Sequence, residues 1–520
     1  MNEAADTAAK PLVVLALRGI TKRFGALLAN DAVDLELRQN EILALVGENG
    51  AGKTTLMNIL FGHYVADAGE VLVAGTDGEL VALEPGSPAA ALERGIGMVH
   101  QHFTLAENLT GLENIVLGTE SLLRPRLSAA PRRKIEALMQ NSGLTVDLDV
   151  PVSRLAVGEK QRIEILKALY RDVRILVMDE PTAVLTPQEA EGLFHTIAML
   201  AAQGLAVIFI AHKLGEVLAV SERIAVLRGG RMVGEMATRD VDRRRIAELM
   251  VGRDVPVSRR SPREPGAALL ELRDVTVAGA DARTSLHKVS LSLREGEIVG
   301  IAGVSGNGQA ALAQLVAGIA RQTSGDMLLY GAPVRRHDPR AFARAGIARI
   351  PEDRHHDGIV GAMTVAENVI IEEVREAAFQ RAGFLKHEAI RARAEAAIRD
   401  YDIRCSGPDA PSRLLSGGNI QKLILARVLD RNPRLVLANQ PTGGLDIGAQ
   451  TDVQRRLLEA RQAGAGVLLI SEDLDELMVL SDRIAVIHSG HLTEARPTET
   501  LDRGVLGLLM AGHHDEEAAA

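Results

Sequence analysis

A glycine-rich stretch at residues 47–55 holds the first residues of the chain whose types and spacing could do chemistry. It reads GENGAGKTT and fits the pattern G-x-x-x-x-G-K-[ST], after an apolar run that ends at Val46. Glycines let backbone N–H groups close around phosphate oxygens, and a helix that begins near Lys53 favours negative charge at its start. We expect Lys53 to reach the β- and γ-phosphates of a nucleotide and the Thr54 hydroxyl to coordinate Mg²⁺. The predicted nucleotide-binding residues are Gly47, Glu48, Asn49, Gly50, Ala51, Gly52, Lys53, Thr54 and Thr55.

Two adjacent carboxylates, Asp179 and Glu180, follow the apolar run ILVM in the segment ILVMDEP. At the end of a buried strand Asp179 can hold the metal through its hydration shell, and Glu180 can orient or deprotonate an attacking water. The alternative makes both residues acidic helix-start residues ahead of Pro181. Two carboxylates at the end of an apolar run are costly without a cation, which favours the chemical role.

A second glycine-rich stretch, residues 303–310, has the same setting but different side chains. It reads GVSGNGQA and also follows an apolar run and opens a helical pattern. Gln309 stands at the position of the lysine and Ala310 at the position of the hydroxyl. The second stretch therefore has the glycines of a phosphate loop but lacks its lysine and its hydroxyl.

The chain contains a long internal repeat, which predicts its architecture. Residues 44–62, 175–187 and 221–232 match residues 300–318, 435–447 and 481–492, in the same order and at nearly constant spacing. Short Val/Ile/Leu runs alternate with longer helical patterns in both halves, which predicts an α/β fold with a mostly parallel sheet. Residues from about 102 to about 153 show helical patterns without such runs and predict an inserted helical subdomain.

The composition bounds the class of protein. The chain has 520 residues, 47% hydrophobic and 24% charged, with a net charge of −9, which favours a folded protein of several domains and argues against duplex binding. The basic run 243–245 is interpreted as a solvated helix face. A single cysteine, Cys405, excludes an internal disulfide, is expected to be a small buried or half-buried residue, and fits a reducing compartment. No apolar run approaches the roughly 20 residues that span a bilayer, and the polar start of the chain does not resemble a signal peptide.

The repeat and the local composition place the domain boundaries. We expect a disordered start at 1–10, a first domain at 11–251, a linker at 252–267, a second domain at 268–511 and a disordered tail at 512–520. The linker GRDVPVSRRSPREPGA is rich in Pro, Gly and charge and has no helical or strand period.

Nearly the whole chain, residues ~11 to ~511, resembles the ATP-binding-cassette family. The resemblance implies two tandem nucleotide-binding domains, each with a P-loop sheet core, an antiparallel β subdomain and an inserted helical subdomain. It implies that Phe24 stacks on adenine, that Gln101 is the Q-loop residue that contacts Mg²⁺ and water, and that His212 is the switch histidine at the γ-phosphate. The family signature LSGGQ is nearly intact at residues 415–419 as LSGGN, and is LAVGE at 155–159.

In this family two domains pack head to tail, so that each ATP lies between one phosphate loop and the opposite signature. The resemblance implies a complete first site that joins the first half's motifs to Ser416, Gly417, Gly418 and Asn419. The second site would instead contain Gln309, Ala310, Glu352, Asn439, Gln440 and Glu472 and face the degenerate signature. Loss of one preorganised donor commonly costs ~10² to 10³ in rate, so the second site is expected to be inactive. Members of the family have an aspartate shortly after the position of Glu180. The second half has it as Asp446, but the first half has Thr186 there, so the sequence does not decide whether the two sites communicate.

Finer features indicate a branch of the family. The segment PEDR at 351–354 resembles ATPase subunits of bacterial sugar-type importers for ribose and galactose, and NQPTGGLD at 439–446 resembles the purine-nucleoside branch. The resemblance implies ATP and Mg²⁺ as cofactors, two integral-membrane permease subunits as partners, and a periplasmic or lipoprotein receptor that supplies the solute. The protein would then lie at the cytoplasmic face of the cell membrane. The alternatives are a soluble tandem cassette that acts on ribosomes or DNA, and a cassette that drives an exporter.

Overall fold

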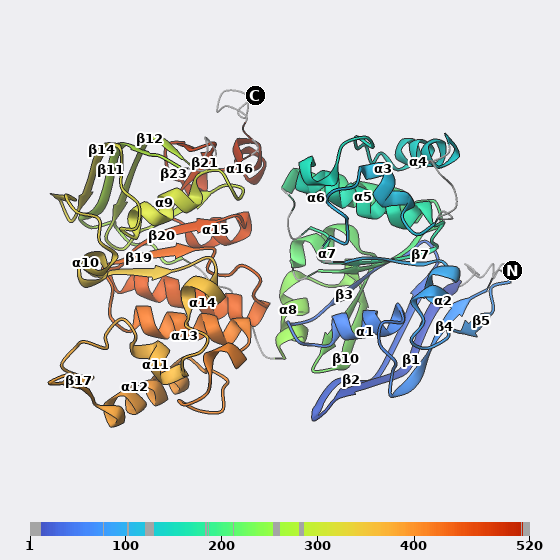
Figure 1. The fold of residues 1–520 in the computed structure, drawn as a ribbon, viewed down its shortest axis with the longest axis horizontal. Helices are drawn as coiled ribbons and strands as arrows, with labels where there is room; N and C mark the ends of the chain where they lie inside the picture. Colours follow the sequence, from blue (N-terminus) through green and yellow to red (C-terminus); the bar gives the residue numbers. More distant parts are fainter. Residues whose placement is uncertain are drawn as a thin grey trace, which may run out of the picture. The chain divides into compact units, whose positions relative to one another are not determined.

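The structure is a computed structural model that describes residues 12–75, 77–100, 103–119, 129–182, 185, 187–211, 213–252, 260–279, 285–510 and 512. The chain forms two compact units, Met1–Val255 and Pro256–Ala520. Each unit repeats the same order of elements (Figure 1). The predicted α/β class, with a mostly parallel core sheet in each half, is confirmed.

The core of the first unit is a six-stranded sheet of order β10-β9-β3-β8-β7-β6. Its inner strands run parallel and only the edge strand β10 is antiparallel to its neighbour. Every residue of β3, β7 and β8 is buried, as expected for strands covered on both faces. The strands are β3 (Ile42–Val46), β6 (Ile96–Val99), β7 (Ile175–Asp179), β8 (Ala206–Ile210), β9 (Arg223–Arg228) and β10 (Arg231–Ala237).

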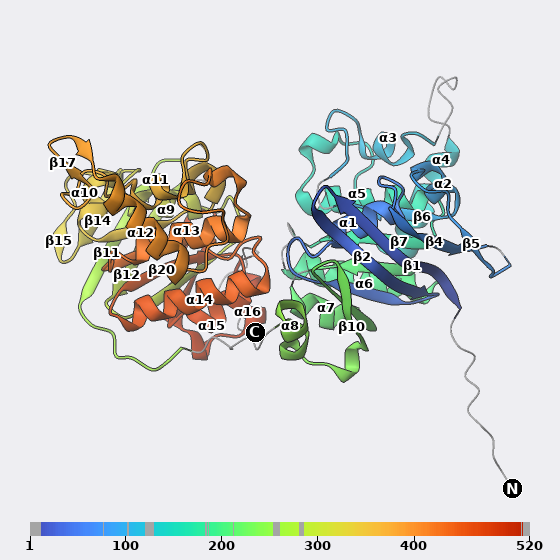
Figure 2. The ribbon, with the colours of Figure 1, turned by 90° about the horizontal axis from the view of Figure 1, so that it is seen from below.

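A separate antiparallel sheet of order β2-β1-β4-β5 packs on the first core through a shared apolar cluster that also contains the helix α1. Its long strands show the alternating burial of a sheet with one covered face. Figure 2 shows β1 and β2 as long paired ribbons beside α1. The strands are β1 (Val13–Phe24), β2 (Leu27–Arg38), β4 (Ala68–Ala74) and β5 (Leu80–Ala82).

Two helices of the first unit, α3 and α4, lie in the predicted inserted region. The Thr110 hydroxyl and the Glu113 carboxylate cap α3 reciprocally, and the same capping box recurs at Thr364 and Glu367 in the second unit. The helices are α1 (Lys53–Leu60), α2 (Pro88–Glu93), α3 (Gly111–Val116), α4 (Ala129–Ser142), α5 (Val157–Tyr170), α6 (Pro187–Ala202), α7 (Leu214–Val220) and α8 (Arg243–Val251), with 3₁₀ turns at Val152–Arg154 and Thr238–Asp240. The arginines at 243–245 are exposed at the start of α8, as predicted.

The second unit has the same core, of order β16-β19-β20-β13-β21-β22, with β23 also paired to β21. Alternate residues of its buried strands enter two apolar clusters, one on each face of the sheet. One cluster joins the sheet to α13, α14 and α15, and the other joins it to α9 and the antiparallel strands. The strands are β13 (Ile298–Ala302), β16 (Ile347–Ile350), β19 (Leu435–Asn439), β20 (Gly466–Ser471), β21 (Arg483–His488), β22 (His491–Leu492) and β23 (Arg496–Pro497).

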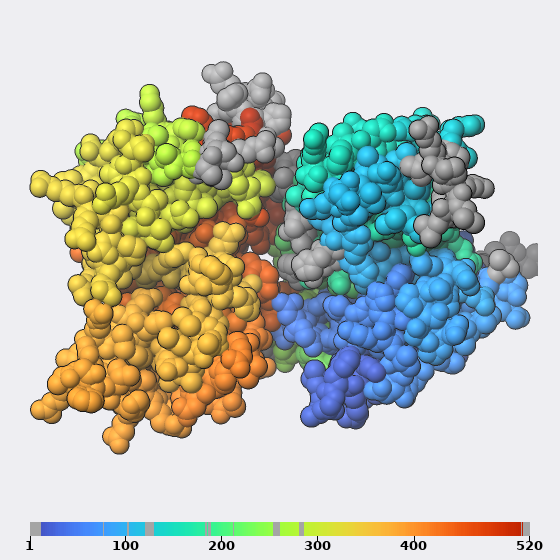
Figure 3. All heavy atoms as spheres, viewed as in Figure 1, coloured from blue at the N-terminus to red at the C-terminus, as the bar shows by residue number. Residues whose placement is uncertain are grey.

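An antiparallel sheet of order β12-β11-β14-β15 and an inserted helical region complete the second unit. They lie at opposite ends of this unit, coloured yellow-green and orange in Figures 1 and 3. A small hairpin, β17–β18, precedes α12 within the insertion, and half-buried Cys405 lies between α12 and α13. The strands are β11 (Ala268–Val277), β12 (Leu286–Arg294), β14 (Ser324–Leu329), β15 (Ala332–Pro333), β17 (Gln380–Arg381) and β18 (Phe384–Leu385).

The helices of the second unit follow the order of the first, with one additional irregular turn. This turn is π-helical and spans Arg354–Gly358. The helices are α9 (Gln309–Val316), α10 (Pro339–Arg344), α11 (Val365–Ile370), α12 (His387–Asp400), α13 (Gly417–Leu429), α14 (Ile447–Gln462), α15 (Leu474–Leu480) and α16 (Arg503–Met510), with 3₁₀ turns at Ser412–Leu414 and Thr498–Thr500.

Within the segment predicted as a linker, 252–267, residues 260–267 are bound to the second unit. Arg260 donates to the Ser481 carbonyl and pairs with Asp482 at 3.3 Å. The buried Arg461 of α14 donates to the Ser261 carbonyl at 2.9 Å. Residues 260–267 therefore belong structurally to the second unit, although their composition shows no regular period.

Arg461 is predicted to be a structural anchor of the second unit. It is only 2% exposed and donates two hydrogen bonds to Asp482, at 2.9 and 2.7 Å. Arg461→Met should lower the free energy of unfolding of this unit by about 2–3 kcal/mol, because Asp482 loses two charged hydrogen bonds and keeps the longer contact with Arg260. The control Arg455→Met, on an exposed face of the same helix, should change it by less than about 1 kcal/mol. Denaturant titration of both variants measures the difference, and equal effects would contradict the anchoring role.

Candidate functional site: a phosphate loop and its uncharged copy

The phosphate loop of the first unit joins β3 to α1 and depends on close backbone contacts. A Cβ atom at Gly47 would overlap the Leu227 carbonyl, and one at Gly52 would overlap the Ala29 carbonyl. Gly52 also has a φ of 105°, which an L side chain rarely adopts. The α1 helix then begins at Lys53 without a side-chain cap, so its first turn has the form of an anion-binding helix N-terminus.

Lys53 lies inside this loop and is only 7% exposed. Its Nζ donates to the Gly47 carbonyl at 2.6 Å and to the Glu48 carbonyl at 3.1 Å. The ammonium charge is therefore fixed where the loop would surround phosphate oxygens, and the neighbouring Thr54 is exposed.

Asp179 ends β7 and Glu180 follows it with a strained backbone. Burial raises the pKa of Asp179 to about 6, the charge of Glu180 acts in the same direction, and Lys53 opposes both. Glu180 has a φ of 49°, and its N–H donates to the Ile210 carbonyl of β8 at 2.9 Å. A buried carboxylate at a loop that already holds a lysine fits a divalent cation, because Mg²⁺ prefers oxygen ligands.

The other predicted residues of the first unit are unevenly placed. Phe24 is 44% exposed, meets Tyr64 edge to face at 5.6 Å, and has the Lys22 ammonium 5.6 Å from its ring centre. An exposed, supported ring of this kind can stack on a base. Gln101, Thr186 and His212 lie outside the described residues.

The glycine stretch of the second unit folds as the same loop between β13 and α9. A Cβ atom at Gly303 would lie 2.8 Å from the Ile487 carbonyl, which matches the constraint at Gly47, and Gly308 has a φ of 110°. Gln309, 7% exposed, takes the place of the lysine: its Nε2 donates to the Val304 carbonyl at 2.6 Å. Its Oε1 accepts from the Asn307 N–H at 3.0 Å. The glutamine amide therefore bonds the loop to itself without adding charge.

Amides also replace the two carboxylates. Asn439 ends β19 and donates to Glu352 at 3.3 Å, while its buried Oδ1 has no hydrogen-bond partner among the described residues. Gln440 repeats the geometry of Glu180, with a φ of 49° and an N–H that donates to the Ile470 carbonyl at 2.8 Å. Its Oε1 accepts from the Glu472 N–H at 3.4 Å. The second unit therefore has the same strained backbone after its strand as the first, but with neutral amides in place of the two carboxylates.

The two signature segments both precede a helix but differ in their polar contacts. In the second unit Asn419 donates to the Ser416 hydroxyl at 2.8 Å and accepts from the Arg404 N–H at 2.8 Å, at the start of α13. In the first unit Glu159 accepts from the Ala156 N–H at 2.8 Å at the start of α5. The intact signature thus keeps a hydroxyl at its helix start, and the degenerate one places a carboxylate there.

The buried carboxylate of Glu476, which belongs to none of the predicted motifs, stabilises the loop after β19. Glu476 accepts from the Thr442 hydroxyl at 2.8 Å and from the Ser471 hydroxyl at 2.6 Å, and burial raises its pKa to about 7. The first unit repeats the contact between Thr182 and Glu216. The sequence repeat could have revealed this pair, because a threonine and a glutamate recur at matching positions in the two halves.

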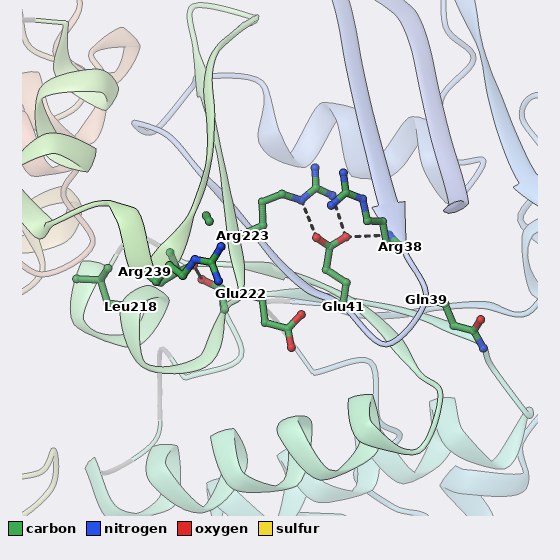
Figure 4. Close-up of a pocket in the computed structure, with 10 residues that line it drawn as sticks. Arg38, Gln39, Glu41, Leu218, Glu222, Arg223 and Arg239 are labelled. Carbon is green, nitrogen blue, oxygen red and sulfur yellow. Dashed lines mark hydrogen bonds and ion pairs between the residues drawn. The ribbon is translucent and has the colours of Figure 1, made fainter. Parts of the chain in front are cut away.

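A cavity of about 650 Å³ lies beside the starts of β3 and β9, at the end of these strands away from the phosphate loop (Figure 4). Its polar centre is the ion pair of Arg223 and Glu41, at 2.6 Å, with Glu41 also accepting from the Arg38 N–H at 2.8 Å. Arg483 and Glu297 form the same pair in the second unit at 2.7 Å. This ion pair recurs in both units, where it links the starts of two neighbouring strands. It is separate from the phosphate loop.

Two P-loop units with one charged and one uncharged loop define a tandem nucleotide-binding protein. The family model "ABC transporter" matches residues 30–183 and 286–443, and the chain belongs to this family. It is an ATP-binding protein and an ATPase of that family, which confirms the resemblance seen in its motifs. Among the described residues, no helix is long and apolar enough to cross a membrane.

Curated relatives align over almost the full chain. A glucose import ATP-binding protein (TsgD13) of Haloferax volcanii is 42% identical over 97% of this chain and 97% of its own. A nucleoside import ATP-binding protein (NupA) of Lactococcus lactis is 42% identical over 97% and 99%, and a guanosine import ATP-binding protein (NupO) of Bacillus subtilis is 41% identical over 97% and 98%. A solved complex of the archaeal ribosome recycling factor aABCE1 has a TM-score of 0.63 at 18% identity over 92% of this chain and 90% of that one, which shows a shared fold.

The raised pKa of Glu476 predicts a pH dependence of stability. Because the folded pKa lies above the ordinary glutamic acid value, folding favours the protonated form. The contribution of this group is full below the unfolded pKa and is lost as the pH rises toward about 7. Glu476→Gln should therefore remove part of the fall in unfolding temperature between pH 5 and pH 8. Thermal unfolding at both pH values tests this, and an unchanged pH slope in Glu476→Gln would contradict it.

Proposed function

We propose that this chain is the energy-coupling ATPase subunit of an importer for a sugar or a nucleoside, with one catalytic and one degenerate ATP site. The observation that carries the proposal is the complete set of Lys53, Thr54, Asp179 and Glu180 in one half, in a chain whose relatives are import ATP-binding proteins over their full length. Nucleoside or guanosine import occurs in the names of two of these relatives and glucose import in another, so the solute class stays open between them.

The first unit's residues divide the work of hydrolysis. Lys53 and the loop N–H groups bind the β- and γ-phosphates, and Phe24 stacks on adenine. Glu180, the first residue after β7, orients and deprotonates the attacking water. Gln101 would contact the attacking water and Mg²⁺, and His212 would contact the γ-phosphate.

Mg²⁺ would be held by Thr54, Asp179 and Gln101, and it neutralises charge on the transferred phosphoryl group when bound. Burial raises the pKa of Asp179 to about 6, and a bound cation would favour its ionised form, which supports this proposal.

The signature of the second unit is proposed to complete this ATP site. Ser416, Gly417, Gly418 and Asn419 would donate to the γ-phosphate bound at Lys53, and closure over ATP would move the membrane subunits. The uncharged loop at Gln309 and the LAVGE signature would form the second, non-hydrolysing site. The bonds of Gln309 within its own loop support a structural role for that copy.

Two integral-membrane permease subunits are the proposed partners, fed by a periplasmic or lipoprotein receptor, with this chain peripheral at the cytoplasmic face of the membrane. Action on ribosomes or nucleic acid is the alternative. The full-length relatives at 41–42% identity support import, whereas the ribosome recycling factor shares only the fold at 18% identity.

Glu180→Gln should retain ATP binding and lower turnover by about two orders of magnitude or more, as for other lost transition-state groups. Gln440→Glu, the reciprocal change at the matching position, should leave ATPase activity within about twofold, because the other groups of that site are also absent. Both are measured in the transporter assembled with its permease. Near-normal hydrolysis in Glu180→Gln would exclude Glu180 as the catalytic carboxylate, and a large gain in Gln440→Glu would show that the second site is nearly competent.

Ser416→Arg should abolish transport and ATPase activity, although it lies outside the unit that carries Lys53. Ala156→Arg, at the matching position of the degenerate signature, should be much milder, because its proposed site has no chemistry to lose. Transport assays with the assembled protein compare the two after circular dichroism confirms equal folding. Retained activity in Ser416→Arg, or an equal loss in both variants, would refute the proposed composite site.

A further inference from the structure

Different charged side chains lie beside the starts of the two signature helices. In the second unit the guanidinium of Arg354 lies behind the signature, with its Nε 3.7 Å from where a Cβ atom on Gly417 would be. Arg354 is half-buried in the π-helical turn that follows β16, and Asp353 fixes this turn by accepting from two N–H groups at 2.9 Å. A positive side chain thus approaches the first residue of α13.

The same guanidinium holds the loop that follows β19. Its Nη2 donates to the Gly443 carbonyl at 2.6 Å and lies 3.1 Å from the Cβ position of Gly444. Gln421 of α13 donates to the Pro441 carbonyl of this loop at 2.8 Å. Arg354 and Gln421 therefore tie the start of the signature helix to the loop between β19 and α14.

In the first unit a carboxylate lies against Gly158, the signature residue that matches Gly418. A Cβ atom on Gly158 would overlap the Glu189 carboxylate, and Glu159 caps the same helix start. In the second unit the residue that matches Glu189 is Ala449, whose Cβ lies 3.5 Å from the Cβ position of Gly418. Phe103 occupies the position that matches Arg354. The first signature is thus lined by acidic groups, and the second by a guanidinium and a methyl group.

This difference matters because a triphosphate is strongly anionic. Positive charge near a helix N-terminus adds to the helix dipole in favour of an anion, and negative charge opposes it. In the second unit Asp446 is the acidic group near Ala449, and its carboxylate is engaged by the Ala449 N–H at 2.8 Å as the cap of α14. Partial burial lowers the pKa of Arg354, but an arginine stays charged at neutral pH.

We propose that Arg354 is a positioning residue of the ATP site: its charge behind Gly417, together with the absence of a carboxylate at Ala449, makes the second unit's signature attract the γ-phosphate. Glu189 and Glu159 give the first unit's signature the opposite polarity. The inference rests on the proposed function, in which the second signature meets the nucleotide bound at Lys53.

The direct test introduces the first unit's carboxylate into the second unit. Ala449→Glu is compared with the neutral, nearly isosteric Ala449→Gln in the full transporter, by measuring kcat/KM for MgATP hydrolysis. We expect Ala449→Glu to lower kcat/KM about threefold to thirtyfold relative to Ala449→Gln, the range expected for a charge at a helix start. Raising the salt concentration should narrow the gap, because the interaction is screened. Equal values for the two variants at low salt would overturn the proposal.

A second pair of variants separates charge from hydrogen bonding at Arg354. Arg354→Lys keeps the charge and should stay within about threefold of wild type, whereas Arg354→Gln keeps a donor and should lose about threefold to thirtyfold in kcat/KM. A merely structural role predicts that lysine fails as badly as glutamine, and that result would overturn the assignment. Arg349→Gln changes a half-buried arginine of β16 that pairs with Asp357 at 2.9 Å, and it controls for general disturbance of this region.

Ser416→Arg in the same assay distinguishes the two levels of inference. If Ser416→Arg is inactive while Ala449→Glu equals Ala449→Gln, the charge assignment fails and the composite site stands. If Ser416→Arg is fully active, the composite site fails, and the charge assignment fails with it.

Discussion

Both phosphate loops depend on one contact, in which the first glycine of the loop lies against a carbonyl at the end of a neighbouring strand. In the first unit Gly47 faces the Leu227 carbonyl of β9, and in the second Gly303 faces the Ile487 carbonyl of β21. Neither position has room for a Cβ atom without movement of the backbone. The constraint belongs to the packing of loop on sheet, so it acts whether or not a phosphate ever binds.

This contact explains why the second half keeps a glycine-rich frame and omits its charge. The glycines are required by the fold, whereas the lysine is required only by the phosphate. Gln309 satisfies the loop with two hydrogen bonds of its own, and Gln440 keeps the strained backbone of Glu180 with a neutral side chain. These contacts are consistent with the proposal that the second unit carries the signature at Ser416 without a competent ATP site of its own.

The sequence predicted the parts of the molecule that local pattern determines. The loop at Lys53, the strand that ends at Asp179 and the doubled α/β architecture follow from periodicity, glycine spacing and the repeat. The contact of Arg354 with Gly417 and the attachment of Arg260 to Asp482 could not be predicted, because they join residues far apart in the chain through side chains of ordinary type. The assigned roles of the site residues, including Gln101 and His212, stay predictions.

The central claim is that one chain hydrolyses ATP at a single site built on Lys53. The most direct measurement is the number of nucleotides trapped per chain, after the transporter turns over MgATP in the presence of orthovanadate and unbound nucleotide is removed. We expect at most one trapped nucleotide per chain in the wild type and none in Lys53→Ala, with Gln309→Ala like the wild type. Two trapped nucleotides per chain, or a nucleotide that survives Lys53→Ala, would contradict it.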